Sequence, residues 1–472
     1  MGVVTTRKGF LGGFLSAGAL GGCSSLGISA PPALLKFGVV SDIHVTTPES
    51  CAMFRRALAY FRRRGADAVV VAGDLADWGL RSGLRYVKEA WDAEMSGSGA
   101  VPLFITGNHD FDGWWYGDMT LDMHVQGYSE ADALSRHGMK ACWEEAFGES
   151  WAPFRTRVVK GFEFVSTEWG RENEAKAVEW AKSRAGEAAV RPMFFIRHQP
   201  LPGTTGDSGS GDTSLRDALA ALPNCVSFTG HTHRTLNDER SIWQGGGLTA
   251  ISVPSMSYTS LPGGYENGSG ARDGSCISSM AKLPSRAKLL EAQGFFVVVR
   301  AGTMEVERYD FEERETAAPP WIVPMPLSCG RPYAFEEHAK RTPVPAFPSG
   351  AAVSVRTVNS ERRNGRWSIF MELTFPAARS PGDGRVFDYE IRTVGESGET
   401  LAAKRFLSPA FYRARRHEQG EMSFLFDAMD VPETGEYNFH VVARNCFGAE
   451  SAPLVSRAFR SVPGKTVPKH ES

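Results

Sequence analysis

The feature that most constrains the fold is a regular alternation of short apolar runs with amphipathic stretches, which begins at Leu35. The apolar runs predict strands at residues 35–40, 68–72, 101–106, 162–167, 192–197 and 226–229. The amphipathic stretches predict helices at residues 53–64, 80–94, 172–183 and 214–222. Strands that alternate with helices are typical of βαβ units, so we expect a layered α/β domain.

The pattern changes after two apolar runs, 295–300 and 303–311, which predict a pair of strands joined as a hairpin. Residues 316–349 are rich in proline, which predicts a surface linker. Beyond Gly350, alternation predicts strands at 353–358, 367–375, 387–393, 422–426 and 437–443, as in an all-β sandwich of about 110 residues. The segment from Tyr437 to Asn445, followed by Phe447 and Gly448, resembles the penultimate strand and loop of a fibronectin type III domain. We therefore expect a fibronectin type III-like domain at 350–462 and a tail at 463–472.

Composition excludes several classes of protein. Lys+Arg 52 against Asp+Glu 54 gives a net charge of −2, so the chain lacks the basic balance expected of a nucleic-acid-binding surface. A hydrophobic content of 42% is sufficient for a sizeable core. No apolar run after residue 30 approaches the roughly 20 residues of a spanning helix, which excludes an integral membrane channel or transporter.

The first residues have the layout of a targeting segment. Arg7 and Lys8 precede an apolar stretch that ends in Leu20-Gly21-Gly22-Cys23. Small residues before a cysteine resemble the lipobox of bacterial lipoproteins, which implies cleavage before Cys23 and acylation of its thiol. Residues 6–11 also resemble a twin-arginine export signal, with Lys8 in place of the second arginine.

We therefore expect a signal peptide at 1–22, a tether at 23–35 and a lipid anchor at Cys23. The anchor would place the protein at a bacterial cell envelope membrane, either periplasmic or on the cell surface. The alternative is an ordinary secretory signal with an incidental cysteine. Besides Cys23, six cysteines remain, which fit either disulfides or buried free thiols: Cys51, Cys142, Cys225, Cys276, Cys329 and Cys446.

Metal-binding side chains directly follow five of the predicted strands. They lie in the segments Asp42-Ile43-His44, Gly73-Asp74, Gly107-Asn108-His109-Asp110, His198 and Gly230-His231-Thr232-His233. In an open α/β sheet, ligands bind outside the carboxyl ends of the strands. Residues two apart converge where the chain is extended, which predicts that the Asp42–His44 and His231–His233 pairs each point one way. The glycines before Asp74, Asn108 and His231 allow sharp turns and close backbone approach.

Oxygen and imidazole ligands without thiolate suit Zn, Fe or Mn. Seven ligands are more than one metal ion needs. They are Asp42, His44, Asp74, Asn108, His198, His231 and His233. They suffice for two ions if one carboxylate bridges, and Asp74 is the natural bridge.

Together and in this order, the five segments resemble the motifs of the calcineurin-like metallophosphoesterase superfamily, over roughly residues 36 to 310. The resemblance implies a double β-sandwich flanked by helices, in a domain at 36–315, with two divalent or trivalent metal ions. It implies one ion on Asp42, His44 and His233, a second on Asn108, His198 and His231, and a bridge at Asp74. His109 would lie beside the scissile phosphate, with Asp110 orienting its ring. The purple acid phosphatase branch is not matched, because it lacks a histidine at the position of His44 and uses a metal-bound tyrosine that is missing after Asp74.

The implied activity is hydrolysis of phosphate mono- or diesters outside the cytoplasm, in which a metal-bridging hydroxide attacks phosphorus and His109 assists the leaving group. Two alternatives stay open. One is a phosphodiesterase specific for nucleotides, sugar phosphates or phospholipid head groups, and the other is a non-catalytic surface binding lipoprotein. We interpret Asp77 as a turn residue and Trp114 to Tyr116 as either substrate contacts or packing residues. Because every predicted ligand precedes residue 234, we expect residues 350–462 to be dispensable for chemistry.

Overall fold

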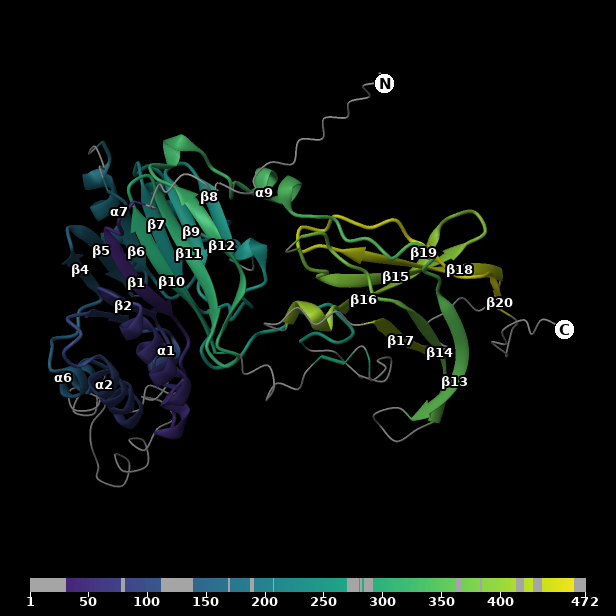
Figure 1. Ribbon diagram of the computed structural model, residues 1–472, viewed down its shortest axis with the longest axis horizontal. Coiled ribbons are helices and arrows are strands. Elements are labelled where there is room, and N and C mark those ends of the chain that lie inside the picture. Colours follow the sequence, from purple (N-terminus) through teal and green to yellow (C-terminus); the bar gives the residue numbers. More distant parts are fainter. Residues whose placement is uncertain are drawn as a thin grey trace, which may run out of the picture. The chain divides into compact units, whose positions relative to one another are not determined.

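The computed structural model describes most of the chain from residue 31 onward. The described residues are 31–77, 81–111, 139–168, 170–186, 191–206, 208–269, 280, 282–283, 292–361, 367–382, 384–412, 420–427 and 435–461. The signal peptide and Cys23 predicted from the sequence lie outside this set, as do Trp114 to Tyr116 and Cys276. Figure 1 shows the ribbon with its elements labelled.

Two six-stranded sheets form the first part of the chain. The first has the order β12-β11-β10-β1-β2-β3 and the second has the order β4-β5-β6-β7-β9-β8. The strands of the first sheet are β1 (Leu35–Val40), β2 (Ala68–Ala72), β3 (Val101–Ile105), β10 (Gln293–Arg300), β11 (Thr303–Asp310) and β12 (Glu315–Pro324). Those of the second are β4 (Phe154–Val159), β5 (Phe162–Thr167), β6 (Met193–Ile196), β7 (Cys225–Thr229), β8 (Ile242–Gly245) and β9 (Leu248–Ser252).

The main core lies between these two sheets. Phe37 of β1 packs edge-on against three aromatic rings of the second sheet, those of Phe164, Phe194 and Phe228, at centroid distances of 5.4, 5.0 and 5.8 Å. All four side chains are fully buried or nearly so. Edge-to-face aromatic pairs add about 0.5–1.5 kcal/mol each beyond the area they bury, so this cluster holds the sheets face to face.

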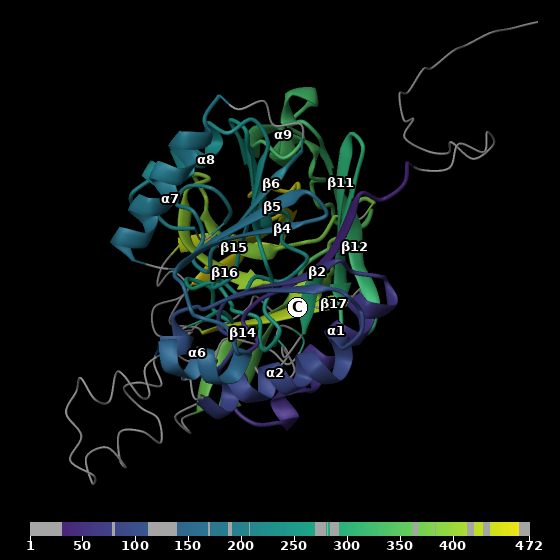
Figure 2. The ribbon, with the colours of Figure 1, turned by 90° about the vertical axis from the view of Figure 1, so that its left-hand side faces the viewer.

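Helices cover the outer faces of both sheets (Figures 1 and 2). The first sheet packs through Val69, Val71 and Phe296 against the apolar faces of α1 (Ala52–Arg63), α2 (Arg81–Met95) and α6 (Met139–Phe147). The second sheet packs against α7 (Arg171–Arg184) and α8 (Ser214–Ala220). The α/β double β-sandwich flanked by helices, predicted from the alternation and the motifs, is therefore confirmed.

Within each sheet the strands that carry the motifs run parallel. β1, β2 and β3 pair in parallel, as do β6 and β7. The carboxyl ends of parallel strands lie at the same end of the sheet, so the residues that follow these strands gather there. This arrangement places the five predicted segments in one region.

The structure corrects the expected start of the proline-rich linker. Residues 315–324, which the sequence predicts to lie largely in a linker, form β12, and this strand pairs antiparallel with β11. β12 is the edge strand of its sheet, where a proline without an N–H group interrupts no ladder on the open side. The register shifts near Arg308, opposite Ala318, next to Pro319 and Pro320. The remaining linker contains a turn of 3-10 helix at Leu327–Cys329 and α9 (Phe335–Arg341).

A second β-sandwich follows residue 350. Its sheets have the orders β13-β14-β17 and β16-β15-β18-β19, with β20 also paired to β18. The strands are β13 (Ser354–Glu361), β14 (Trp367–Pro376), β15 (Asp388–Gly395), β16 (Thr400–Leu407), β17 (Glu421–Asp427), β18 (Gly435–Arg444), β19 (Leu454–Val455) and β20 (Phe459–Ser461). The predicted all-β sandwich is confirmed, whereas its fibronectin type III identity stays a prediction. The sequence pattern does not indicate β16, in which only Phe406 and Leu407 are buried and the preceding residues are exposed or partly exposed.

Two further findings concern the cysteines and the helices. Cys51, Cys142, Cys225, Cys329 and Cys446, which are the described cysteines, are free thiols, and all but Cys329 are buried. Among the described residues, no helix has both the length and the apolar character needed to cross a membrane.

Candidate metal centre

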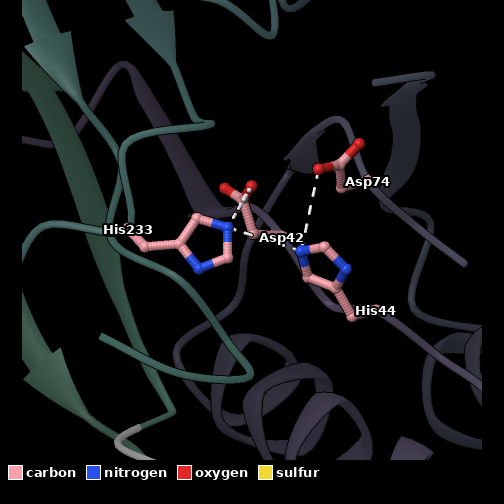
Figure 3. A group of neighbouring side chains, drawn as sticks. All are labelled: Asp42, His44, Asp74 and His233. Carbon is pink, nitrogen blue, oxygen red and sulfur yellow. Dashed lines mark hydrogen bonds and ion pairs between the residues drawn. The ribbon is translucent and has the colours of Figure 1, made fainter. Parts of the chain in front are cut away.

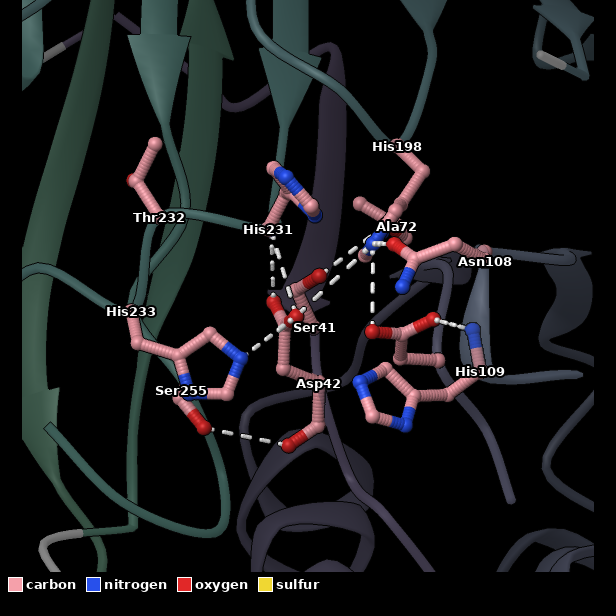
Figure 4. A network of polar contacts seen from close by, with 12 residues as sticks. Ser41, Asp42, Ala72, Asn108, His109, His198, His231, Thr232, His233 and Ser255 are labelled. Atoms are coloured by element: carbon pink, nitrogen blue, oxygen red, sulfur yellow. Dashed lines mark hydrogen bonds and ion pairs between the residues drawn. The ribbon is translucent and has the colours of Figure 1, made fainter. Parts of the chain in front are cut away.

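The five predicted segments meet at the carboxyl ends of β1, β2, β3, β6 and β7 (Figure 4). Four of their side chains form a buried cluster: Asp42, His44, Asp74 and His233 (Figure 3). Their nearest ligand atoms all lie within 4.8 Å of one another. Asp42 Oδ1 lies 3.0 Å from His233 Nε2, and Asp74 Oδ2 lies 3.6 Å from His44 Nε2. Two carboxylates and two imidazoles in such a cluster are a ligand set for a divalent or trivalent ion.

A second group of acceptors lies on the other side of Asp74. His198 Nε2 is 3.2 Å from Asp74 Oδ2 and 3.1 Å from Asn108 Oδ1. The same Asp74 oxygen is therefore close to both His44 and His198. His231 lies beside this group, with its ring centroid 5.2 Å from that of His198 and its backbone N–H donating to the Asp42 carboxylate.

Backbone carbonyls and a carboxylate fix the tautomers of three of these histidines. His198 Nδ1 faces the carbonyl oxygen of Ala72 at 2.8 Å, and His233 Nδ1 faces that of Tyr258 at 3.0 Å. His44 Nδ1 faces Asp77 Oδ1 at 3.1 Å. A carbonyl or carboxylate oxygen only accepts, so Nδ1 carries the hydrogen and Nε2 carries the lone pair in each neutral ring.

The lone pairs assigned in this way point at one another. His44 Nε2 and His233 Nε2 are 3.4 Å apart, and His198 Nε2 faces two oxygen acceptors. Acceptors in such contact repel unless a proton or a cation lies among them. The donor set therefore fits metal ions by its own geometry, and the partners of the Nδ1 atoms have the arrangement that orients metal-binding histidines.

The backbone of the site is unusual. Seven described residues other than glycine have a positive φ in the left-handed region, and five of them are predicted ligands: Asp42, His44, Asp74, His231 and His233. The sequence predicts that the Asp42–His44 and His231–His233 pairs converge through an extended chain, and this prediction is wrong. Tight left-handed turns turn the side chains inward instead. Such conformations cost about 1–3 kcal/mol each and are typical of functional sites.

Two glycines make room for this geometry. A Cβ on Gly107 would lie 2.2 Å from Asp74 Oδ1, and a Cβ on Gly73 would lie 2.4 Å from His198 Nδ1. Gly73 also has a φ of +96°, which side-chain-bearing residues rarely adopt. The predicted need for close backbone approach before Asp74 and Asn108 is confirmed.

The contacts of His109 differ from those predicted. The carboxylate beside its ring is Asp77, whose Oδ1 lies 3.0 Å from His109 Nδ1 as well as 3.1 Å from His44 Nδ1. The sequence predicts that Asp110 orients this ring. Its carboxylate instead accepts the backbone N–H groups of Leu75, Ala76 and Gly107, so it ties the loop after β3 to the loop after β2.

The interpretation of Asp77 as only a turn residue therefore misses a residue of the site. The signal in the sequence was its position three residues after Asp74, which is too common in turns to stand out. The hydrogen bond from His44 and the nearby His109 hold the pKa of Asp77 below its usual range, so it is a carboxylate at neutral pH.

Burial of the site shifts the pKa values of several of its side chains. Burial raises the pKa of Asp110 to about 8, and the charge of Asp74 adds to this effect. Burial disfavours the charged form of His198, but the hydrogen bond and charge of Asp74 outweigh it and raise the pKa of His198 to about 9. Burial opposes ionisation of Asp42 as well, yet His233 keeps the pKa of Asp42 well below its usual range. Asp42 is therefore an anion that attracts positive charge, whereas Asp110 is largely protonated at neutral pH.

Of three comparisons with known proteins, one concerns the residues of this site. The family described as calcineurin-like phosphoesterase matches residues 35–235. A search of curated proteins finds no match. Among solved structures, the chain is similar to a dimetal phosphatase from Danio rerio, with 11% identity, a TM-score of 0.36, and coverage of 62% of this chain and 99% of that one.

Two further structures are similar at the same level. A purple acid phosphatase from yellow lupin seeds has 11% identity and a TM-score of 0.35, over 61% of this chain and 53% of that one. An anchor protein of the inner membrane complex of Plasmodium has 12% identity and a TM-score of 0.33, over 60% of this chain and 86% of that one. The family match and the buried cluster decide the assignment. Residues 35–235 match the calcineurin-like phosphoesterase family, and the candidate metal site of this metallophosphoesterase domain includes Asp42, His44, Asp74 and His233.

Proposed function

We propose that the protein hydrolyses phosphate mono- or diesters with two metal ions. Asp42, His44 and His233 would hold one ion, Asn108, His198 and His231 the other, and Asp74 would bridge them. The observation that carries this proposal is the shared oxygen of Asp74, Oδ2, which lies 3.6 Å from His44 Nε2 and 3.2 Å from His198 Nε2. When bound, such a pair of ions lowers the pKa of water and neutralises phosphate oxygens.

The remaining residues divide the work of positioning and proton transfer. Asp74 Oδ1 accepts the backbone N–H of His109, so the bridging residue also fixes the loop that carries His109. Asp77, as a carboxylate beside His109 Nδ1, favours a proton on that nitrogen and leaves Nε2 to face a substrate. His109 would then protonate or stabilise the leaving oxygen, an effect typically worth roughly 10²–10⁴-fold in rate.

The test is turnover of chromogenic phosphate monoesters and diesters, assayed together with added Mn²⁺, Zn²⁺ or Fe. We expect Asp74→Ala and His198→Ala each to abolish turnover and to lower the bound metal measured by elemental analysis. His440→Ala, in the C-terminal sandwich, is the matched control and should change neither. Full metal content in both ligand variants would refute the ligand assignment. A metal-loaded wild type that cleaves no ester would favour the non-catalytic binding protein, and turnover of diesters alone would favour the phosphodiesterase.

We further propose that the protein is exported and anchored to a cell envelope membrane by lipid on Cys23. The support is the run Leu20-Gly21-Gly22-Cys23 after an apolar stretch. Stable anchoring needs more than one acyl chain, because a single myristoyl chain binds only marginally. Fractionation of cells that express the wild type and Cys23→Ser tests the idea. If the variant partitions with membranes as well as the wild type does, the anchor lies elsewhere.

A further inference from the structure

One segment of the chain lies against the metal cluster at one end and against the C-terminal sandwich at the other. This bridging segment comprises residues 254–269, which follow β9 and form no helix or strand. At its start, the Ser255 hydroxyl donates to the backbone carbonyl of Asp42 at 3.1 Å. Ser255 Oγ also accepts the backbone N–H groups of Ser257 and Tyr258 at 3.0 and 3.2 Å, so the Ser255 hydroxyl ties this turn to Asp42.

The next residues of the bridging segment hold His233. The carbonyl oxygen of Tyr258 is the acceptor that fixes Nδ1 of His233, and the backbone N–H of Ser260 donates to the His233 carbonyl at 2.9 Å. The ring of Tyr258 packs on the imidazole of His233 at a centroid distance of 4.1 Å and lies 5.7 Å from that of His44. The orientation of His233 therefore depends on where this segment lies.

The far end of the bridging segment pairs with the edge of β16. The Asn267 amide makes two bonds to the backbone of Leu407, with Nδ2 donating to the carbonyl at 2.9 Å and Oδ1 accepting the N–H at 2.8 Å. The backbone N–H of Glu266 donates to the carbonyl of Arg405 at 2.9 Å. β16 is the edge strand of its sheet, so these bonds occupy groups that no neighbouring strand uses.

Apolar contacts and burial make this attachment firm. Leu261 and Tyr265 pack on a small core of Phe387, Leu407 and Phe411, and the guanidinium of Arg405 lies 5.0 Å from the centroid of the Tyr265 ring. The side chain of Asn267 is only 8% exposed. A buried amide that loses its hydrogen-bond partners is unfavourable, so the segment would not keep this path if β16 were absent.

We propose that the C-terminal sandwich is a positioning element of the metal site, and that Asn267 is the positioning residue through which it acts. The bridging segment has no secondary structure of its own to resist displacement, so the ends that are bonded decide its path. Loss of the Leu407 contact would leave Tyr258 held only by the Ser255 turn and the adjacent Ser260 bond, and would thereby loosen the Nδ1 partner of His233. This inference rests on the proposed metal-dependent function, and it opposes the expectation that residues 350–462 are dispensable for chemistry.

The experiment compares the full-length wild type with Asn267→Ala, and it uses Asn438→Ala as the matched control. Asn438 donates to the carbonyl of Ser456 at 2.9 Å within the sandwich and does not involve the bridging segment. Hydrogen–deuterium exchange is measured on peptides that span residues 255–262, and the affinity for Mn²⁺ is measured by calorimetry. We expect Asn267→Ala to exchange faster in these peptides and to bind Mn²⁺ about 10–100-fold more weakly, as for other residues that orient metal ligands. Asn438→Ala should match the wild type in both.

Wild-type exchange and wild-type Mn²⁺ affinity in Asn267→Ala would overturn the proposal. If circular dichroism shows that this variant does not fold, Asn267→Asp takes its place, because it keeps the acceptor for the Leu407 N–H and loses only the Nδ2 donor. Faster exchange with weaker affinity in Asn267→Asp supports the proposal, and wild-type values refute it. If the wild type binds Mn²⁺ but cleaves no ester, the proposed hydrolase function is refuted. The hydrogen–deuterium exchange of residues 255–262 and the affinity for Mn²⁺ would still decide the role of Asn267.

Discussion

Replacement of Gly107 by alanine is the most direct test of how tightly the metal site is built. The added Cβ would lie 2.2 Å from Asp74 Oδ1 and 2.5 Å from the backbone nitrogen of Asp74. An ordinary contact begins at 3.4 Å, so the gap must open by 1.2 Å at the carboxylate and by 0.9 Å at the backbone. The φ of Gly107 does not lie in the positive region, so the backbone itself tolerates alanine and the contact with Asp74 is the main perturbation.

The shift falls on the residue that we propose as the metal bridge. A displacement of about 1 Å in a catalytic arrangement typically costs about 10²-fold in rate. We therefore expect Gly107→Ala to lower kcat on a chromogenic ester about 10²-fold at saturating metal, and to weaken metal binding. Steady-state kinetics and calorimetry with Mn²⁺ measure the two effects separately.

The matched control is Gly211→Ala in the same domain. A Cβ on Gly211 would meet only Pro202 Cγ at 3.6 Å, which is an ordinary van der Waals contact, so this variant should keep the wild-type kcat and metal affinity. Gly107→Ala with both values unchanged would refute the reasoning, because the loop after β3 would then be free to move away from Asp74 without consequence.

Three further perturbations test other parts of the structure. Asp77→Asn keeps the size of the side chain and removes its charge beside His44 and His109, so kcat/KM should fall about 10–100-fold; a rate within twofold of the wild type would exclude Asp77 from the site. Glu239 receives bonds from Arg308, Trp321 and His338, and although burial opposes ionisation, the charge of Arg308 lowers the pKa of Glu239 from 4.5 to about 2. Ionised Glu239 therefore adds to the free energy of unfolding above pH 4.5, and this contribution is lost as the pH falls from 4.5 towards 2. The difference corresponds to about 3 kcal/mol, which we reduce to about 2 because the side chain is 26% exposed. Glu239→Gln should lose that amount in urea unfolding of the chelated protein at pH 7 and progressively less below pH 4.5, and a deficit independent of pH would contradict the assignment. Chelation itself should lower Tm, and Mn²⁺ at 100 times its Kd should restore about 2.7 kcal/mol; an unchanged Tm would mean that no ion binds the native state preferentially.

The parts of the fold that the sequence predicts are those with local signals. β1, β2 and β5 have the bounds that their apolar runs predict, and the runs of β2 and β5 are bordered on both sides by polar residues or glycine. The clustering of the five motifs follows from the same pattern, since parallel strands bring their carboxyl ends together. Neither inference needs knowledge of which side chains meet.

The missed features depend on contacts between distant residues. Asp77 meets His109 only after β2 and β3 pair in parallel, so its position in a turn gives no warning of its role. The bonds between Asn267 and Leu407 join residues 140 positions apart. β12 was obscured by its prolines, which are acceptable only because the strand lies at the edge of its sheet, and sheet order is not visible in a single sequence.

The histidine tautomers show why a search for side-chain motifs describes this site incompletely. The partner of His198 is the carbonyl of Ala72 and that of His233 is the carbonyl of Tyr258, so two of the three fixed imidazoles are oriented by groups that every residue carries. The side chains of Ala72 and Tyr258 do not make these bonds, so the orientation of the two imidazoles depends on the path of the backbone at these positions. For Ala72 the path is set by the ladder of β2 between β1 and β3, whereas for Tyr258 it is set by Ser255 and by the attachment of the bridging segment to β16. The two sides of the metal site therefore differ in what holds them, because a central sheet fixes His198 and a loop fixes His233. Perturbations of the C-terminal sandwich should accordingly weaken the ion near His233 before the ion near His198.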